Sequence, residues 1–348
     1  MIIGIDAMGG DNAPEAVISG VELALKNGLE EDEIYLYGDE NVLQRLLFDK
    51  IEKFRNVKIV HCSESIEGDD KPVLAIRKKK DSSIVRGARE LKEGVIDAFI
   101  SAGNTGALLA AGTLVTGRIK GVKRPALTTV YPTEKSFAVL CDVGANAESS
   151  ADNIEHFGLM GSLYAKEILG IENPSVALLN IGTEESKGTP IHIEAHKLMA
   201  ANKLLNFKGN LESRDLLKGE VDVVVCDGFT GNICLKLIEG AATSLMSMIK
   251  KSILGSTKAK IGGLLIKDSL IEMRESLNPS KYGGAPLLGT EHPVIKAHGS
   301  SDEIAFMNAM LYAKKYVSSD LIGKLKEAIQ VAEKESEEHT TDENKEEQ

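Results

Sequence analysis

Runs of apolar residues alternate with amphipathic stretches along most of this chain, and a glycine-containing turn separates each run from the stretch that follows. The pattern begins with MIIGIDAMGGDNAPEAVISGVELAL and recurs in VIDAFISAGNTGALLAAGTLV, SVALLNIGTEESKGTPIHIEAHKLMAA and EVDVVVCDGFTGNICLKLIEGAATSLM. Short runs of Val, Ile, Leu and Ala are typical of strands buried on both faces, and the longer stretches are typical of helices. We therefore predict an α/β fold with a mostly parallel sheet covered by helices on both faces.

Residues 98–117 (AFISAGNTGALLAAGTLVTG) contain no charged residue, in a chain that is 27% Asp, Glu, Lys and Arg. A transmembrane helix needs about 20 mainly apolar residues, so the length would fit. However, four glycines and the turn sequence GNTG interrupt the segment. We expect a buried strand at 98–100, a tight turn, and a helix that starts at about residue 107.

Polar side chains cluster at five of the glycine turns. In parallel sheets, ligands bind where strands end, and the N–H groups at a helix N-terminus attract anions. The clusters therefore predict a site for a phosphate-sized or carboxylate-sized anion, although each single turn could equally be a tight connection without a ligand. The candidate binding residues are Asp6, Gly10, Asp11, Asn12, Ser101, Gly103, Asn104, Thr105, Gly106, Asp142, Asn146 and Glu184, and Asn180, Asp227 and Asn232 stand at the same turns.

Several well-known catalytic motifs are absent from the sequence. It contains no G-x-G, no phosphate-binding G-x-x-x-x-G-K-[ST] and no G-x-S-x-G. His192 and His196 stand four residues apart in HIEAH, but their order differs from H-E-x-x-H. We therefore expect no metal at these histidines. The four cysteines form no C-x-x-C pair, which is typical of reduced thiols in the cytosol.

Charge is distributed unevenly along the 348 residues. The formal net charge is −11, and residues 331–348 contribute −6 of it through eight acids and two lysines. We expect this tail to be disordered, and an acidic body argues against nucleic acid as a ligand. Residues 1–330 are expected to form one two-lobed catalytic domain.

Two basic stretches stand out in this acidic chain. Residues 71–89 hold seven Lys and Arg and one acid, which indicates either a solvated helix face or a surface for an acidic partner. Residues 250–267 hold five lysines among apolar residues, at the tip of a helical hairpin expected at about 232–280. Such a tip suits an anionic membrane surface, or else a dimer contact. The tip residues are Ile253, Leu254, Leu264, Leu265 and Ile266.

Eight motifs, in order, resemble the bacterial phosphate acyltransferase family over residues 1 to about 320. They are GIDAMGGDNAP, RKKKDSS, SAGNTGAL, CDVGAN, NIGTEESKG, DGFTGN, YGGAPLLG and AHGSS. The resemblance implies transfer of a fatty acyl group from acyl-acyl carrier protein to inorganic phosphate, giving acyl phosphate for phospholipid synthesis. It also implies a cofactor-free homodimer related in fold to isocitrate and isopropylmalate dehydrogenases. The enzyme would attach peripherally to the cytoplasmic membrane, where an embedded glycerol-3-phosphate acyltransferase uses the product.

In this reaction phosphate attacks the thioester carbonyl, so the protein must hold an anion and stabilise an oxyanion. Lys187 would supply a positive charge, Asn232 a neutral donor, and Asp227 or His298 acid–base chemistry. The acidic carrier protein would dock on Arg77, Lys78, Lys79, Arg86 and Arg89.

Three alternatives remain from the sequence. They are a phosphotransacetylase that uses acyl-coenzyme A, a dehydrogenase of the same fold, and a membrane-associated adaptor without activity.

Overall fold

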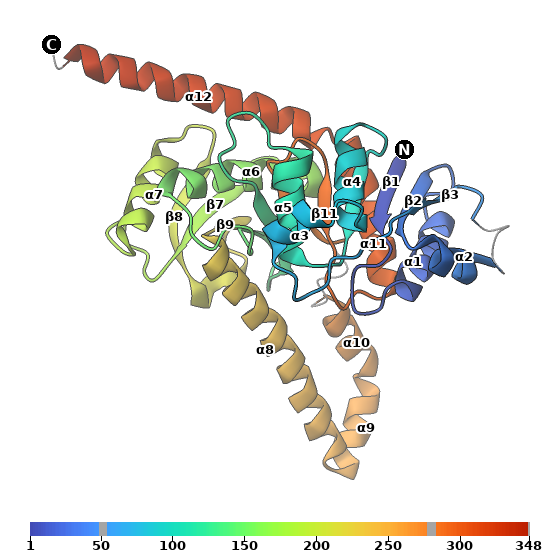
Figure 1. Cartoon of the computed structure of the whole chain (residues 1–348). Coiled ribbons are helices and arrows are strands. Elements are labelled where there is room, and N and C mark those ends of the chain that lie inside the picture. Colours follow the sequence, from blue (N-terminus) through green and yellow to red (C-terminus); the bar gives the residue numbers. More distant parts are fainter. Residues whose placement is uncertain (49–53, 277–282, 347–348) are drawn as a thin grey trace.

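The computed structural model describes residues 1–48, 54–276 and 283–346. Within them the strands form one 11-stranded sheet, ordered β3-β2-β1-β4-β11-β10-β5-β6-β9-β7-β8 (Figure 1). The strands are β1 (Ile2–Asp6), β2 (Glu33–Gly38), β3 (Val57–His61), β4 (Ala98–Ser101), β5 (Ala126–Pro132), β6 (Phe137–Cys141), β7 (Ser175–Asn180), β8 (Asn206–Glu212), β9 (Val223–Val225), β10 (Ala285–Leu288) and β11 (Val294–Lys296).

Helices cover both faces of this sheet, as the apolar pattern predicts. The helices are α1 (Glu15–Lys26), α2 (Glu40–Leu47), α3 (Pro72–Lys78), α4 (Ser83–Lys92), α5 (Thr105–Ala111), α6 (Ala151–Leu169), α7 (Pro190–Ala201), α8 (Gly228–Leu254), α9 (Thr257–Leu265), α10 (Lys267–Ser276), α11 (Glu303–Ser318) and α12 (Leu321–Glu346), with a π-helical turn at Gly112–Thr116 and a 3-10 helix at Ser213–Lys218.

Alternating side chains of each strand enter cores on opposite faces of the sheet. Ile34 and Leu36 of β2 belong to the core formed with α1, α2, α6, α7, α11 and α12 on one face. Tyr35 and Tyr37 belong to the core formed with α3, α4 and α5 on the other face. On that second face, a separate core under the start of α8 covers β5, β6, β7 and β9. The two smaller cores leave a seam between α5 and α8.

The strand–turn–helix expected at 98–117 is confirmed. Strand β4 ends at Ser101 and α5 begins at Thr105, so the charge-free segment enters the core instead of forming one long helix. In the described residues, no helix combines the length and apolarity that crossing a bilayer requires.

The direction of the strands reverses across the middle of the sheet. Strands β1, β2, β3, β4 and β11 are parallel to one another, and so are β6, β7, β8 and β9. Between these halves, β10 pairs antiparallel with β11 and β5, and β5 pairs antiparallel with β6. The two halves therefore point in opposite directions, and the registers bring the carboxyl ends of β11 (Lys296) and β6 (Leu140) to the same level over β5.

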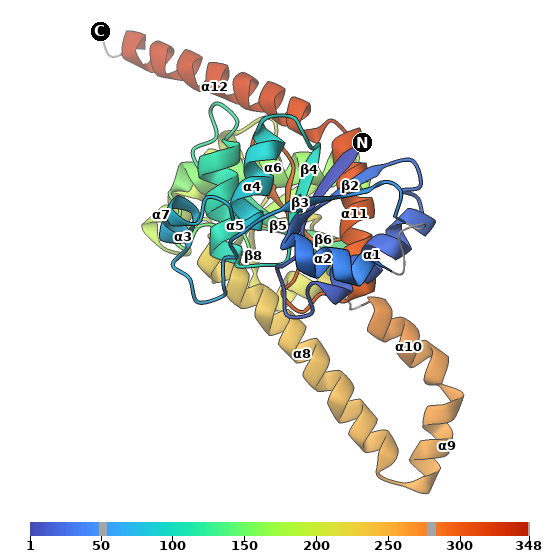
Figure 2. The same cartoon turned by 45° about the vertical axis from the view of Figure 1, so that its right-hand side comes forward.

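Helix α8 leaves the body of the molecule and projects into solvent, and α9 and α10 lead back toward the body (Figures 1 and 2). This is the place where the sequence predicts a hairpin. Its last predicted residues, 277–280, lie outside the described residues. Of the 27 residues of α8, only Gly228 and Gly231 are buried, so the helix is anchored by its first turn.

The close approach of backbone atoms explains why positions 228 and 231 are both glycine. A Cβ atom on Gly231 would lie 1.9 Å from the carbonyl oxygen of Asp142, and one on Gly228 would lie 2.6 Å from the carbonyl oxygen of Asn146. The first turn of α8 therefore packs directly on the loop 142–146, which any side chain would prevent.

The acidic segment 331–346 belongs to α12 in the structure, whereas the sequence analysis expects disorder there. Helix α12 extends away from the body in a direction different from that of α8 (Figure 1). The segment contains no Gly or Pro, and its six Glu and two Lys residues favour helix.

We expect the Gly231→Ala substitution to destabilise the protein by about 1–3 kcal/mol, because overpacking at a fixed backbone contact costs this much. Gly240→Ala, on the same helix with nothing within 4 Å of its Cβ position, should be neutral or stabilise by up to about 1 kcal/mol. Urea unfolding curves of both variants measure the difference. Equal effects would contradict the anchoring role of the first turn.

Candidate active site

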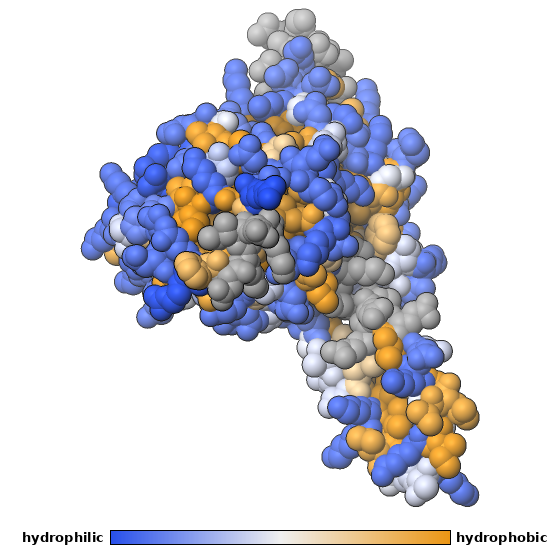
Figure 3. Space-filling view, turned by 90° about the vertical axis from the view of Figure 1, so that its right-hand side faces the viewer, coloured by the Kyte–Doolittle hydropathy of each residue, from blue (hydrophilic) through white to orange (hydrophobic). Residues whose placement is uncertain are grey.

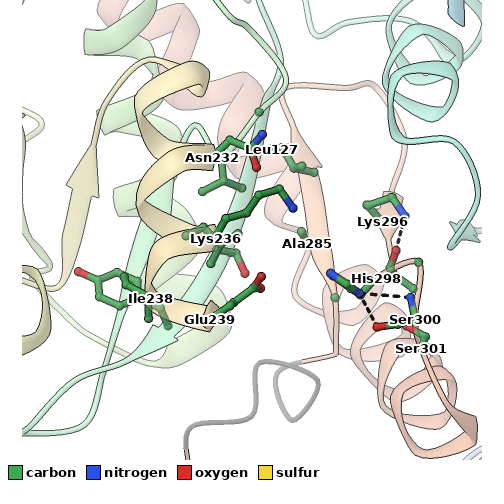
Figure 4. A pocket seen from close by; sticks show the side chains of 18 of the residues that line it. Leu127, Asn232, Lys236, Ile238, Glu239, Ala285, Lys296, His298, Ser300 and Ser301 are labelled. Atoms are coloured by element: carbon green, nitrogen blue, oxygen red, sulfur yellow. Dashed lines mark hydrogen bonds between the residues drawn. The ribbon is translucent and has the colours of Figure 1, made fainter. Parts of the chain in front are cut away.

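A pocket of about 1100 Å³ lies in the seam between α5 and α8 (Figure 4). Residues 127–132 of β5 line it, together with the start of α5, one face of α8, and the turn 296–301 that follows β11. It therefore lies over the strands where the direction of the sheet reverses. Such reversals are common ligand sites in α/β folds.

Cationic and hydrogen-bonding side chains enter the pocket from several elements. Lys236 and Asn232 come from α8, Lys296 from the end of β11, His298 from the turn after it, and Thr105 from the first turn of α5. In Figure 4 the Lys236 side chain points from α8 toward the side of the pocket that holds Ala285 and His298. Two ammonium groups, together with helix N-termini, make this end of the pocket suitable for an anion.

Lys296 lies where the ends of the neighbouring strands β11, β4 and β1 come together. Ser101 is its Cα partner on β4, and the Ser101 hydroxyl donates a hydrogen bond of 2.7 Å to the Asp6 carboxylate at the end of β1. Burial lowers the pKa of Lys296 to about 8, although the carboxylates of Asp6 and Asp11 oppose this change. Burial raises the pKa of Asp6, while the hydrogen bond from Ser101 opposes this rise.

His298 is exposed and presents one ring nitrogen to the pocket. Its Nδ1 accepts a hydrogen bond of 3.2 Å from the Ser300 backbone N–H and lies 2.8 Å from the Ser300 hydroxyl. Because Nδ1 acts as an acceptor, the neutral ring carries its proton on Nε2. That nitrogen points away from the Ser300 contacts and into the pocket (Figure 4), so His298 can donate a hydrogen bond there.

Three residues of the 101–104 turn that are predicted to bind phosphate form their hydrogen bonds within the protein. The Ser101 hydroxyl donates to Asp6 and accepts from the Gly103 N–H at 3.0 Å. The Asn104 side chain caps α5 through the Ala107 N–H and donates to the carbonyl oxygens of residues 67, 68 and 70. These three residues do not line the pocket, whereas Thr105 and Gly106 do, and their role in binding phosphate stays a prediction.

The turn after β1 likewise supports another loop. The Asn12 side chain donates to the carbonyl oxygens of Ser300 and Ser301, and the Asp11 N–H donates to the Gly299 carbonyl at 2.7 Å. Gly10 has a φ of +112°, which favours glycine. These residues position the turn that carries His298 and do not line the pocket themselves.

The Asp142 side chain holds the loop 142–146 in place. Its carboxylate accepts hydrogen bonds from the backbone N–H groups of residues 127, 144, 145 and 146, and from the Asn146 side chain. Burial raises the pKa of Asp142, and these five donors oppose the rise by stabilising the charged form. Asp227 caps α8 through the N–H and hydroxyl of Thr230. Asn232, one turn further along α8, is the predicted residue from this region that reaches the pocket.

Lys187 and Glu184 do not line the pocket. They lie in the loop after β7, where their charged groups are 3.9 Å apart and largely exposed. The turns after β6 and β9, which belong to the same half of the sheet as β7, reach the pocket through Gly144 and Asn232, whereas the loop after β7 does not. The predicted roles of Lys187 and Glu184 stay predictions.

Two functional candidates were missed by sequence reasoning, Lys236 and Lys296. Lys296 directly precedes the AHGSS motif at a strand end, which is a usable signal. Lys236 lies one helical turn after Asn232 of the DGFTGN motif, and residues four apart share a helix face.

Metal-binding geometry is not found in the part of the chain that the structure describes, since no group of three or more His, Cys, Asp or Glu side chains lies together. His192 contacts the Thr189 hydroxyl, and His196 is buried against the Phe207 ring.

Comparisons with known proteins agree with this architecture. A protein structure of a phosphotransacetylase from Streptococcus pyogenes superposes with a TM-score of 0.62 at 16% identity, covering 92% of this chain and 94% of that one. The structure of a branched-chain phosphotransacylase from Enterococcus faecalis superposes with a TM-score of 0.57 at 15% identity, covering 91% of this chain and 99% of that one. At these identities the likeness concerns the fold.

Sequence relatives are much closer. A protein called phosphate acyltransferase from Alkaliphilus oremlandii is 48% identical over 94% of this chain and 97% of its own length. A protein of the same name from Streptococcus uberis is 49% identical over 94% of this chain and 97% of its own length. A family model described as fatty acid synthesis protein matches residues 1–324. The chain therefore belongs to this family of fatty acid synthesis proteins, together with the phosphate acyltransferases.

Proposed function

We propose that this protein transfers a fatty acyl group from acyl-acyl carrier protein to inorganic phosphate. The observation that supports this most directly is the pairing of Lys236 and Lys296 in one pocket, beside the first turn of α5 and the turn that carries His298. The relatives' shared name, phosphate acyltransferase, points to the same reaction.

Phosphate would lie between the two lysines, whose charges hold the anion close to the thioester carbonyl. One of its oxygen atoms attacks the carbonyl carbon, and the carbonyl oxygen becomes an oxyanion. The Nε2–H of His298 and the amide of Asn232 are the neutral donors available to this oxyanion, where losing one donor typically costs about 3–4 kcal/mol. The tetrahedral intermediate then collapses, the carbon–sulfur bond breaks, and the carrier thiolate leaves with acyl phosphate as the product.

Direct attack by phosphate agrees with the state of the cysteines. None of the four lines the pocket. Burial raises the pKa of Cys62 to about 12 and also raises the pKa values of Cys141, Cys226 and Cys234. Their thiols are therefore poor nucleophiles at neutral pH, and phosphate itself fills this role.

The carrier protein would dock beside the pocket, on α3. Pro72 of α3 lies against Gly106 of α5, since a Cβ on Gly106 would be 2.5 Å from the proline ring. Arg77 and Lys78 are exposed and form no ion pair with residues that the structure describes. The other three predicted docking residues are engaged within the chain: Lys79 pairs with Asp70, Arg86 with Asp81 and Glu90, and Arg89 donates to the Lys80 carbonyl.

The far end of the projection would contact an anionic membrane surface and make the protein peripheral to the cytoplasmic membrane. Leu264 and Leu265 are 73% and 81% exposed, and the five lysines of 250–267 are exposed around them. Figure 3 shows apolar and charged side chains side by side on these helices. Ile253 differs from the prediction, because it is half-buried and packs against Gly263. Acyl phosphate released by a protein held at this surface would be close to the membrane-embedded glycerol-3-phosphate acyltransferase.

A homodimer would cover the face of α8 that points away from the pocket. Ile233, Leu237, Leu245 and Met248 are each more than half exposed there, and their spacing places them on one side of the helix. Sedimentation equilibrium should give twice the mass of one chain, and the mass of a single chain would exclude this role.

The purified protein should consume acyl-acyl carrier protein only when phosphate is present, and hydroxylamine should trap acyl phosphate as the hydroxamate. Turnover of acyl-coenzyme A without turnover of the carrier substrate would instead favour the phosphotransacetylase alternative. Lack of turnover with both substrates would overturn the proposed reaction.

The KM for phosphate should rise as the pH increases through about 8, because Lys296 loses its positive charge there. A guanidinium group stays charged throughout this range, so Lys296→Arg should remove the rise. The same exchange at Lys236 should leave the rise in place. An identical pH profile for the wild type and Lys296→Arg would show that Lys296 does not bind phosphate.

Reversing the charges of Arg77 and Lys78 to Glu should raise the KM for the carrier substrate by roughly tenfold at low salt and weaken its salt dependence. The KM for phosphate should stay unchanged. Lys203→Glu with Lys208→Glu makes the same change in net charge near the opposite edge of the sheet and serves as the control. Equal effects of the two double variants would contradict docking on α3.

The double variant Leu264→Glu with Leu265→Glu should no longer sediment with liposomes that contain phosphatidylglycerol, because both the apolar contact and the charge attraction are lost. Phe48→Glu with Ile181→Glu changes two exposed apolar residues of the body and should sediment like the wild type. Sedimentation of the Leu264/Leu265 variant would exclude the tip as the membrane contact.

A further inference from the structure

The pocket continues well beyond the groups that an acyl transfer to phosphate requires. From Asn232 to Met246, the residues of α8 that line it span about 21 Å along the helix axis. They recur three and four positions apart and therefore share one face of α8. Ile271 of α10 lines the pocket as well, so the pocket extends from the body into the base of the projection.

This extension becomes apolar with distance from the lysines. Lys236 and Glu239 are the last charged residues of α8 along the pocket, and Ala242, Thr243 and Met246 follow. On the side of the body, Pro132 of β5 and Ile238 of α8 add apolar surface. The change from charged to apolar lining runs in one direction, from His298 toward the projection.

The polar atoms of this part are already hydrogen-bonded within the protein. The Thr243 hydroxyl donates to the Glu239 carbonyl oxygen at 2.9 Å, and the Tyr131 hydroxyl donates to the Leu216 carbonyl oxygen at 3.2 Å. Thr243 therefore offers a methyl group to an occupant, and neither Thr243 nor the buried Tyr131 offers a free hydroxyl proton. An amide-containing occupant would lose its bonds to water here without replacement.

We propose that the extension between α8, β5 and α10 binds the hydrocarbon chain of the acyl group. This rests on the proposed function, since it places the acyl carbonyl at Lys236, Lys296 and His298. The chain then runs past Ala242 and Met246, with its methyl end between α8 and α10. The pantetheine arm of the carrier, which contains amides, is disfavoured in this part because the lining beyond Glu239 is apolar and the Thr243 and Tyr131 hydroxyls already donate within the protein.

The groove sets a preference for long chains, because each methylene buried against Ala242, Met246 and Ile271 adds affinity. Burial of one methylene increases affinity by about fourfold. Met246 has a flexible side chain that adapts to chains of different shape. A bulky residue at position 242 closes the groove in its middle and limits the length that can be buried.

Alkyl phosphates test the groove without any turnover, so the result is independent of the acyl transfer assay. Affinities of butyl, octyl and dodecyl phosphate are measured by isothermal titration below their micelle concentrations. Wild-type affinity should increase with each added methylene, by up to about fourfold. Ala242→Trp and Met246→Glu should lose this increase and keep the wild-type affinity for butyl phosphate. Ser247→Trp, at the next position of α8 and outside the pocket, should retain it.

Loss of the chain-length effect in both groove variants, with the effect kept in Ser247→Trp, supports the proposal. It is overturned if wild-type affinity does not depend on chain length, or if both groove variants show the full increase. If the groove result holds while the protein shows no phosphate-dependent turnover, the groove stands and the proposed reaction fails.

Discussion

The contact between the first turn of α8 and the loop 142–146 is the constraint on which the rest of the site depends. Helix α8 has only Gly228 and Gly231 buried, so its direction is set where these glycines meet the backbone of that loop. The loop keeps its shape because the Asp142 carboxylate collects five hydrogen bonds. Everything that α8 carries, from Asn232 and Lys236 to the far end of the projection, is oriented by this contact.

The reversal of strand direction at β10 and β5 decides where ligands can bind. An uninterrupted parallel sheet would bring the turns after all its strands to one edge, as the repeated sequence pattern suggests. Here the two parallel halves point in opposite directions, and the seam over β5 separates two smaller cores. The pocket occupies this seam, so one helix can contribute both a cationic end near His298 and an apolar wall along the projection.

The polar residues of the turns fall into two groups, those that bond to neighbouring turns and those that are left to bind a ligand. Ser101, Asn104, Asp142 and Asp227 satisfy backbone N–H groups of neighbouring turns, because buried donors without partners are costly. Lys296 donates a hydrogen bond to the Ala297 carbonyl oxygen and lies near Asp6 and Asp11, and burial lowers its pKa. The groups left to meet a ligand are therefore the lysines, His298 and the first turn of α5, which sit on the scaffold that the other residues hold in place.

The sequence by itself determined the α/β class, the strand–turn–helix at 98–117 and the family, and it singled out Asn232, Thr105, Gly106 and His298, which line the pocket. These follow from local periodicity, turn residues and ordered motifs, which act over a few neighbouring positions. Only the tertiary structure decided that the two halves of the sheet oppose each other, that Lys187 lies outside the pocket, and that Lys236 and Lys296 face it together. Strand direction and the pairing of residues 60 positions apart depend on packing between distant segments, which no local pattern records.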